Sequence, residues 1–316
     1  MPPRIPVGNG AGRWFVGVMP ENQFTFDNPV DRYPHITPPK DQVPEPGRDS
    51  ELDPPADHGE SSYVGSGRLT DRKALVTGGD SGIGAAAAIA FAREGADVAI
   101  VYLPEEEVDA QAIGEQIRAA GTKALLLPGD LTDRAFSTAV VSRVVEEFGG
   151  LDILVNNAGK QIFCTDLAEL PDEQFDRTMK TNVYAMFWLT KDALPHLKPG
   201  STIINTTSVQ AYMPGEQLVD YATTKAAINA FTKGLAQQLA PQGIRVNAVA
   251  PGPIWTPLQP SAGQPPEELP DFGSQTPIGR AGQPAELAPA YVFLASPESS
   301  YVIGETLSVN GGMPTP

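Results

Sequence analysis

The sequence predicts a doubly wound α/β fold, in which helices cover both faces of a seven-stranded parallel sheet. Two observations predict it. From Arg68 onward, short and continuously apolar segments alternate with longer helical segments. A glycine-rich turn, Thr77–Gly84, joins the first apolar segment to the first helix. Continuously apolar strands need cover on both faces, so the sheet should be parallel and should bind ligands at the carboxyl ends of its strands.

The expected strands, in chain order, are Lys73–Thr77, Asp97–Tyr102, Lys123–Leu127, Ile153–Asn156, Ser201–Thr207, Arg245–Val249 and Glu305–Val309. The expected helices are Gly82–Glu94, Glu105–Ala120, Asp133–Phe148, Asp172–Leu194, Tyr221–Leu239 and Pro284–Leu294. Boundary residues support several of them, because Gly95 ends the first helix, Asp133 is an N-cap for the third and Pro171 precedes the fourth.

Residues 1–66 differ from residues 67–316 and are expected to form an extended, proline-rich arm beside one folded domain. They hold 12 of the 32 prolines and show little periodicity, so they cannot build a core of their own. Two apolar clusters, Trp14-Phe15-Val16 and Phe24-Thr25-Phe26, predict that the arm docks on the domain or on a neighbouring subunit. The alternative is a disordered leader with incidental aromatic residues.

Composition excludes several classes of protein. A net charge of −16 and a pI of about 4.5 argue against a nucleic-acid surface or a polybasic membrane anchor. No apolar run reaches the roughly 18 residues of a membrane span. The single cysteine, Cys164, excludes a disulfide within the chain and favours a cytoplasmic setting. His35, His58 and His196 lack metal-ligand spacing, so no metal is expected.

The turn Thr77-Gly78-Gly79-Asp80-Ser81-Gly82-Ile83-Gly84 follows a strand and opens a helix, which is the context of a pyrophosphate site. Glycine lets the backbone approach the phosphates, and the helix N-terminus offers unpaired N–H groups. After the second strand, Tyr102 is followed by three glutamates at 105–107. These carboxylates disfavour the 2′-phosphate of NADP, but acids are also favoured at a helix N-terminus, so NAD and NADP both stay open.

Tyr221 and Lys225 lie four residues apart on an expected helix and therefore share one face, with Ser208 thirteen residues before the tyrosine. An ammonium beside a phenol favours the phenolate and lowers the tyrosine pKa from about 10. A tyrosine with a lowered pKa can donate or accept a proton near neutral pH.

These motifs, taken together, closely resemble the short-chain dehydrogenase/reductase superfamily over about residues 69–313. The matching residues are Thr77–Gly84, Asp130, Asn156-Asn157-Ala158-Gly159, Asn182, Ser208, Tyr221, Lys225 and Pro251-Gly252. The stretches 62–69, 126–130 and 251–256 also resemble the glucose/ribitol-dehydrogenase-like oxidoreductases, a subgroup with an N-terminal extension.

The resemblance implies a Rossmann fold and an NAD(P)-dependent oxidoreductase that moves a hydride between nicotinamide and a small aldehyde, ketone or polyol. It implies Tyr221 as the general acid/base, with Lys225 lowering the pKa of Tyr221 and holding the nicotinamide ribose. Ser208 would orient the substrate oxygen, and Asn182 would support a water that links Lys225 to solvent. The implied cofactor-binding residues are Gly78, Asp80, Ser81, Gly82, Ile83, Gly84, Tyr102, Asp130, Leu131, Asn157, Ala158, Gly159, Tyr221, Lys225, Pro251, Gly252, Ile254 and Thr256. A homotetramer is also implied.

Substrate contacts are expected from Gln161, Ser208, Gln210 and Trp255, with Lys160, Ile254 and Leu258 as further candidate wall residues. Residues 253–284 are rich in Pro, Gly and Gln, which predicts a mobile lid. Two alternatives stay open on the same fold. One is a non-catalytic nucleotide-binding or sensory protein, and the other is a lyase or epimerase that uses the same tyrosine.

Overall fold

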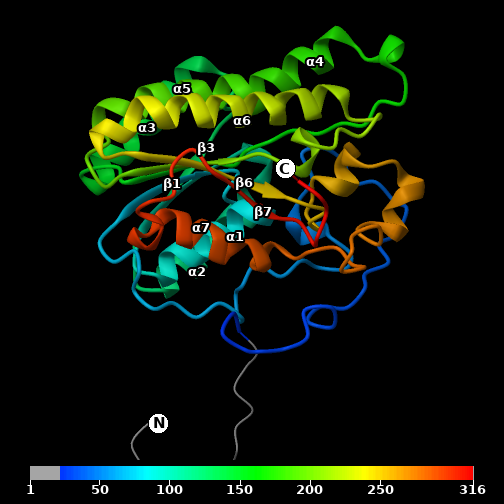
Figure 1. Cartoon of the computed structure of the whole chain (residues 1–316), viewed down its shortest axis with the longest axis horizontal. Coiled ribbons are helices and arrows are strands. Elements are labelled where there is room, and N and C mark those ends of the chain that lie inside the picture. The colour runs from blue at the N-terminus through cyan, green and yellow to red at the C-terminus, as the bar shows by residue number, and fades with distance from the viewer. Residues whose placement is uncertain (1–21, 316) are drawn as a thin grey trace, which may run out of the picture.

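The computed structural model describes residues 22–315, and its centre is a seven-stranded parallel sheet (Figure 1). The strands are β1 (Lys73–Thr77), β2 (Asp97–Tyr102), β3 (Ala124–Pro128), β4 (Ile153–Asn156), β5 (Thr202–Thr206), β6 (Arg245–Pro251) and β7 (Thr306–Val309). Their spatial order is β3-β2-β1-β4-β5-β6-β7. The order reverses direction between β1 and β4, and ligands bind at such a switch point in open α/β sheets.

Two layers of helices cover the sheet, as expected for strands that are buried on both faces (Figure 1). One layer holds α1 (Gly82–Arg93), α2 (Glu107–Ala119) and α7 (Pro284–Ala295), whose apolar side chains join one core cluster with strand residues such as Val76 and Ile100. The other layer holds α3 (Arg134–Phe148), α4 (Asp172–Met179), α5 (Ala185–Ala193) and α6 (Val219–Leu239). The predicted fold class is confirmed.

The expected elements match the structure closely, apart from two helices. The expected helix Asp172–Leu194 is divided, because a π-helical turn at Lys180–Tyr184 separates α4 from α5. The expected helix Glu105–Ala120 begins as a 3-10 turn at Pro104–Glu106 and becomes α-helical at Glu107. Asp133 is confirmed as an N-cap, since its side chain accepts a hydrogen bond from Ala135 N at 2.8 Å.

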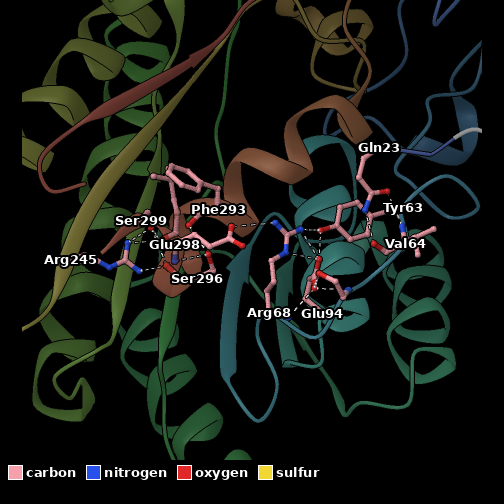
Figure 2. A network of polar contacts seen from close by, with 12 residues as sticks. Gln23, Tyr63, Val64, Arg68, Glu94, Arg245, Phe293, Ser296, Glu298 and Ser299 are labelled. Carbon is pink, nitrogen blue, oxygen red and sulfur yellow. Dashed lines mark hydrogen bonds and ion pairs between the residues drawn. The ribbon is translucent and has the colours of Figure 1, made fainter. Parts of the chain in front are cut away.

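The described part of the arm, residues 22–66, lies along the domain instead of forming a free tail (Figure 1). Tyr63 is buried and donates a hydrogen bond from its hydroxyl to Glu94 at the end of α1 (2.7 Å). Arg68 binds the same carboxylate, and Figure 2 shows this polar network between the arm and the first helix. Further along the domain, the Trp255 indole N–H donates to the Pro54 carbonyl at 2.7 Å.

The arm docks through residues other than the predicted aromatic cluster. Phe24 and Phe26 are 59% and 106% exposed, so the prediction that they lie against the domain is wrong, and packing against a neighbouring subunit stays a prediction. Leu52 provides apolar contact instead, in a small core with Trp255, Leu269 and Ala281. Trp14-Phe15-Val16 lies outside the described residues. Within residues 22–315, no helix combines the length and apolar character needed to cross a bilayer.

Candidate active site

A cavity of about 680 Å³ lies at the carboxyl ends of the strands, where loops after β1, β2, β4, β5 and β6 converge. This volume falls within the range of about 300–1,000 Å³ that is typical of small-molecule sites. The glycine turn, the Tyr221–Lys225 pair and the loop after β6 all line it, together with Glu45, Pro46 and Gly47 of the arm. The sheet therefore brings motifs that are far apart in the sequence to one cavity.

The glycine turn is shaped by close approaches that a side chain would prevent. Gly78 has a φ of +58°, and a Cβ on Gly84 would lie 1.7 Å from the Gly78 carbonyl oxygen. Asn157 holds the turn from β4, since its Nδ2 donates to the carbonyls of Thr77 (3.2 Å) and Gly78 (3.1 Å). Asn157 thus fixes the conformation that brings the turn to the N-terminus of α1.

An arm residue caps that N-terminus. The local N-cap residue, Ser81, makes no side-chain capping hydrogen bond, and Asp49 Oδ2 accepts one from Gly82 N at 2.8 Å. The same oxygen lies 2.8 Å from His58 Nε2, and His58 Nδ1 lies 2.9 Å from Glu60. Burial alone would lower the pKa of His58, but hydrogen bonds to Asp49 and Glu60 outweigh it and raise the pKa to about 10. Sequence motifs gave no sign of this cap, because Asp49 and Gly82 lie 33 residues apart.

Tyr221, Ser208 and Lys225 meet at the cavity wall, and all three are buried. Tyr221 and Lys225 lie on α6, and Ser208 is the second residue after β5. The Lys225 ammonium lies 5.2 Å from the centre of the Tyr221 ring and donates a hydrogen bond to the Thr206 carbonyl at 2.9 Å. Three groups predicted from sequence as one catalytic set are therefore together in space.

The expected effect of Lys225 on Tyr221 is not met in this structure. Burial raises the pKa of Tyr221 to about 12, and a hydrogen bond with Ser208 lowers it only in part. Burial also lowers the pKa of Lys225 to about 8. The prediction failed because helical spacing places the two residues on one face but does not show how deeply the fold buries them.

Asn182 lies beside this set and not on the cavity wall. It belongs to the π-helical turn, and its Oδ1 accepts a hydrogen bond from Lys160 N at 2.7 Å. Its Nδ2 donates to the Lys160 carbonyl (2.9 Å) and to Thr224 Oγ1 (3.0 Å). Asn182 therefore fixes the backbone of the loop after β4, and the role predicted for it in a proton path stays a prediction.

Most of the predicted cofactor and substrate residues line the cavity. The lining residues among them are Gly78, Asp80, Ser81, Gly82, Ile83, Tyr102, Asp130, Leu131, Asn157, Ala158, Gly159, Gln161, Ser208, Gln210, Tyr221, Lys225, Pro251, Gly252, Ile254 and Thr256. Lys160 and Leu258 line it as well. Gly84 does not, because it packs against Gly78 within the turn.

The prediction that Trp255 contacts the substrate is wrong. Its side chain is 1% exposed, points into the small core under the arm, and packs against Phe272 with ring centres 6.1 Å apart. Its sequence neighbours Ile254 and Thr256 line the cavity instead. The segment 253–284 forms compact turns at Gln259–Gly263 and Pro266–Asp271, and its role as a lid stays a prediction.

The site fits a nicotinamide dinucleotide at several points. The first turn of α1 offers N–H groups without intrahelical partners, and those other than Gly82 N, which Asp49 binds, suit a pyrophosphate. Asp80 lines the cavity, and its buried Oδ2 has no hydrogen-bond partner among the described residues, so it can accept a bond from a ribose hydroxyl. Burial and the nearby Glu106 raise the pKa of Asp80 well above its usual value. Glu106 lines the same end, and burial together with Asp109 and Glu105 raises its pKa to about 7.

Comparison with known proteins agrees with this site. A family model described as enoyl-(acyl carrier protein) reductase matches residues 78–314. The chain is 59% identical over 274 residues to the uncharacterized oxidoreductase YghA of Escherichia coli (strain K12), covering 87% of this chain and 93% of the relative. It is 45% identical over 280 residues to glucose and ribitol dehydrogenase of Daucus carota, covering 87% and 96%. It is 46% identical over 277 residues to NADPH-dependent aldehyde reductase 1 of Arabidopsis thaliana, covering 86% and 96%.

A solved structure extends the likeness to three dimensions. A short chain dehydrogenase from Burkholderia cenocepacia J2315, in complex with NADP, has a TM-score of 0.71 and 39% sequence identity. The match covers 78% of this chain and 98% of that one. The chain belongs to the short-chain dehydrogenase/reductase superfamily, as its motifs predicted, and it is an NAD(P)-dependent oxidoreductase.

Proposed function

We propose that the protein reduces small aldehydes, with Tyr221 as the proton donor to the carbonyl oxygen. The observation that carries the proposal is the meeting of Tyr221, Ser208 and Lys225 at the wall of the cavity that also holds the glycine turn. The Arabidopsis relative is named an aldehyde reductase, which supports the same substrate class. Because the pKa of Tyr221 is about 12, its hydroxyl carries a proton at neutral pH and can donate it.

Each residue has one task in this proposal. The bound reduced nicotinamide supplies the hydride that the carbonyl carbon gains. Ser208 donates a hydrogen bond to the carbonyl oxygen and holds it toward Tyr221, which then transfers its proton to that oxygen. Lys225, anchored on the Thr206 carbonyl, places a positive charge beside the phenolate that Tyr221 becomes. Asn182 supports this arrangement by holding the backbone of Lys160, and through a water that links Lys225 to solvent.

The remaining cofactor residues have distinct positions in the proposal. The turn Gly78–Ile83 would hold the pyrophosphate. The adenosine end would be held by Asp80, Tyr102, Asp130 and Leu131. Asn157–Gly159 together with Pro251, Gly252, Ile254 and Thr256 would flank the nicotinamide. Gly84 would act only through the shape of the turn, and Gln161 and Gln210 would contact the substrate.

The test is a spectrophotometric assay at the reduced-nicotinamide band. Purified protein is mixed with a panel of aldehydes, ketones and polyols, in separate series with NADH and NADPH and with NAD and NADP. Consumption of reduced cofactor with aldehydes is the expected result. The proposal is wrong if no compound consumes or forms reduced cofactor while fluorescence titration shows intact cofactor binding.

We also propose that residues 67–316 act as the catalytic domain of a cytoplasmic homotetramer, with residues 1–66 as its arm. Two separate surfaces expose large apolar side chains and suit two kinds of subunit contact. One lies on α4, the π-helical turn, α5 and α6, with Phe175, Tyr184, Phe187 and Val219. The other lies at the β7 edge, with Tyr301, Ile303 and Leu307. Light scattering should give the tetramer mass, and a stable monomer at working concentration would contradict this assembly.

A further inference from the structure

The arm contributes a charged residue to the cavity that Tyr221 lines. Glu45, Pro46 and Gly47 are lining residues, and the Glu45 carboxylate forms an ion pair with the ammonium of Lys160. Lys160 is the better buried partner, since its side chain is 16% exposed against 44% for Glu45. One partner therefore comes from the arm and the other from the loop after β4, 115 residues away in sequence.

Both partners lie in segments whose backbones are held in place. The Lys160 N–H and carbonyl are both bound to the side chain of Asn182, at 2.7 and 2.9 Å. On the arm, Val43 N donates to the Pro260 carbonyl at 3.1 Å. Gly47 has a φ of +81°, and a Cβ there would lie 2.8 Å from the Ser261 Cβ. The ion pair thus joins two segments that are already fixed, so it acts on the charge of the cavity more than on its shape.

Lys160 lies next to the catalytic centre. It follows Gly159, where an added Cβ would lie 3.6 Å from the Lys225 ammonium nitrogen. Its side chain brings a second positive charge to the cavity that Ser208, Gln161 and Gln210 also line. A free ammonium at this point would attract a substrate with a carboxylate, whereas a paired ammonium attracts it much less.

We propose that Glu45 of the arm is a specificity-determining residue, which neutralises Lys160 and so makes the site favour uncharged aldehydes over aldehydes that carry a carboxylate. The inference rests on the proposed function, because it concerns the selectivity of the same reaction. The chemical class it assigns to the preferred substrate is an aldehyde with no anionic group within reach of Lys160.

The experiment measures kcat/KM for two aldehydes of matched shape, one with a terminal carboxylate and the other its branched, uncharged isostere. Glu45→Gln should raise the ratio of kcat/KM for the carboxylate-bearing aldehyde to kcat/KM for the uncharged aldehyde by about fivefold. This change corresponds to about 1 kcal/mol, the upper end for a partly exposed ion pair. Added salt should reduce this gain, because screening weakens the attraction between the Lys160 ammonium and the substrate carboxylate. Lys160→Met in the Glu45→Gln background should return the ratio to the wild-type value.

The control is Glu267→Gln, which removes another ion pair between the arm and the loop after β6. Its partner is Lys40, both side chains are exposed, and neither lines the cavity. This variant should leave the ratio unchanged. An unchanged ratio in Glu45→Gln, or a gain that persists after Lys160→Met, would overturn the inference while neutral-aldehyde turnover by the wild type still supports the proposed function. Absence of wild-type turnover with both aldehydes would overturn the proposed function and this inference together.

Discussion

Replacing Glu94 by glutamine should destabilise the protein strongly, because this carboxylate is the centre of the contact between the arm and α1. Glu94 is 0% exposed and accepts hydrogen bonds from Tyr63 Oη (2.7 Å), Ser66 N (2.8 Å) and Arg68 Nη2 (2.6 Å). Figure 2 shows Tyr63 and Arg68 bound to this carboxylate. Glutamine has the same shape, but it removes the negative charge and turns an N–H₂ donor toward other donors. The substitution therefore leaves the partly exposed Arg68 guanidinium with only the more distant Glu298 as a counter-charge.

The size of the effect follows from the burial of Glu94. Removing one partner of a buried ion pair costs about 3–5 kcal/mol, and the lower end applies because Arg68 is partly exposed. A loss of about 3 kcal/mol is still a large part of the roughly 5–15 kcal/mol that stabilises a typical domain. At about 2 °C for each kcal/mol in a chain of this size, the melting temperature should fall by about 6 °C. Glu298→Gln is the matched control, because Glu298 lies 3.6 Å from the same Arg68 but is 54% exposed. Its loss should cost less than about 1 kcal/mol.

The assay is thermal unfolding followed by circular dichroism, at pH 7 and at pH 3. Burial works to raise the pKa of Glu94, but the hydrogen bonds from Arg68, Tyr63 and Ser66 outweigh it and hold the pKa at about 2. A depressed pKa in the folded state gives stability that is present above pH 4.5 and is lost as the pH falls toward 2. The difference in melting temperature between wild type and Glu94→Gln should therefore be smaller at pH 3 than at pH 7. Equal melting temperatures for Glu94→Gln and Glu298→Gln at pH 7 would refute the reasoning.

Two further predictions concern the site. Gly84→Ala should weaken dinucleotide binding in a fluorescence titration, because its Cβ would lie 1.7 Å from the Gly78 carbonyl oxygen. Gly234→Ala on α6, where nothing lies within 4 Å of the added Cβ, should bind normally and gain about 1 kcal/mol in stability. Burial lowers the pKa of Lys225 to about 8, so the ammonium is lost as the pH rises through 8 and kcat/KM for aldehyde reduction should fall there. Lys225→Arg should move this fall in kcat/KM to higher pH. If the fall stays at the same pH, it belongs to the titration of another group.

Local sequence signals were sufficient for the elements that carry the site. β1, β2 and β4 begin and end at the predicted residues, because each is a continuous apolar run followed by a polar or glycine turn. Ser208, Tyr221 and Lys225 could be grouped because all the motifs together resemble a known family, whereas the Tyr221–Lys225 spacing alone is a weak signal. Each of these signals depends on neighbours along the chain, which a single sequence displays.

The features that could not be predicted depend on tertiary contacts. The arm has no periodicity, and its course is set by contacts such as Trp255 with Pro54, 201 residues apart. The Tyr221 pKa depends on burial that several elements create together. The π-helical turn at Lys180–Tyr184 lies inside a predicted helix, Asp172–Leu194, that no proline or glycine interrupts, so no clear local signal marks it.

The central claim is that Tyr221 donates the proton, and the most direct test compares turnover with cofactor affinity in Tyr221→Phe. Phenylalanine keeps the ring that lies beside Lys225 and removes only the hydroxyl. The account predicts that kcat for aldehyde reduction falls by about 10²–10⁴-fold, the usual contribution of a general acid, while the Kd of the reduced cofactor stays near its wild-type value. Retained turnover, or a loss of cofactor affinity that matches the loss of turnover, would contradict it.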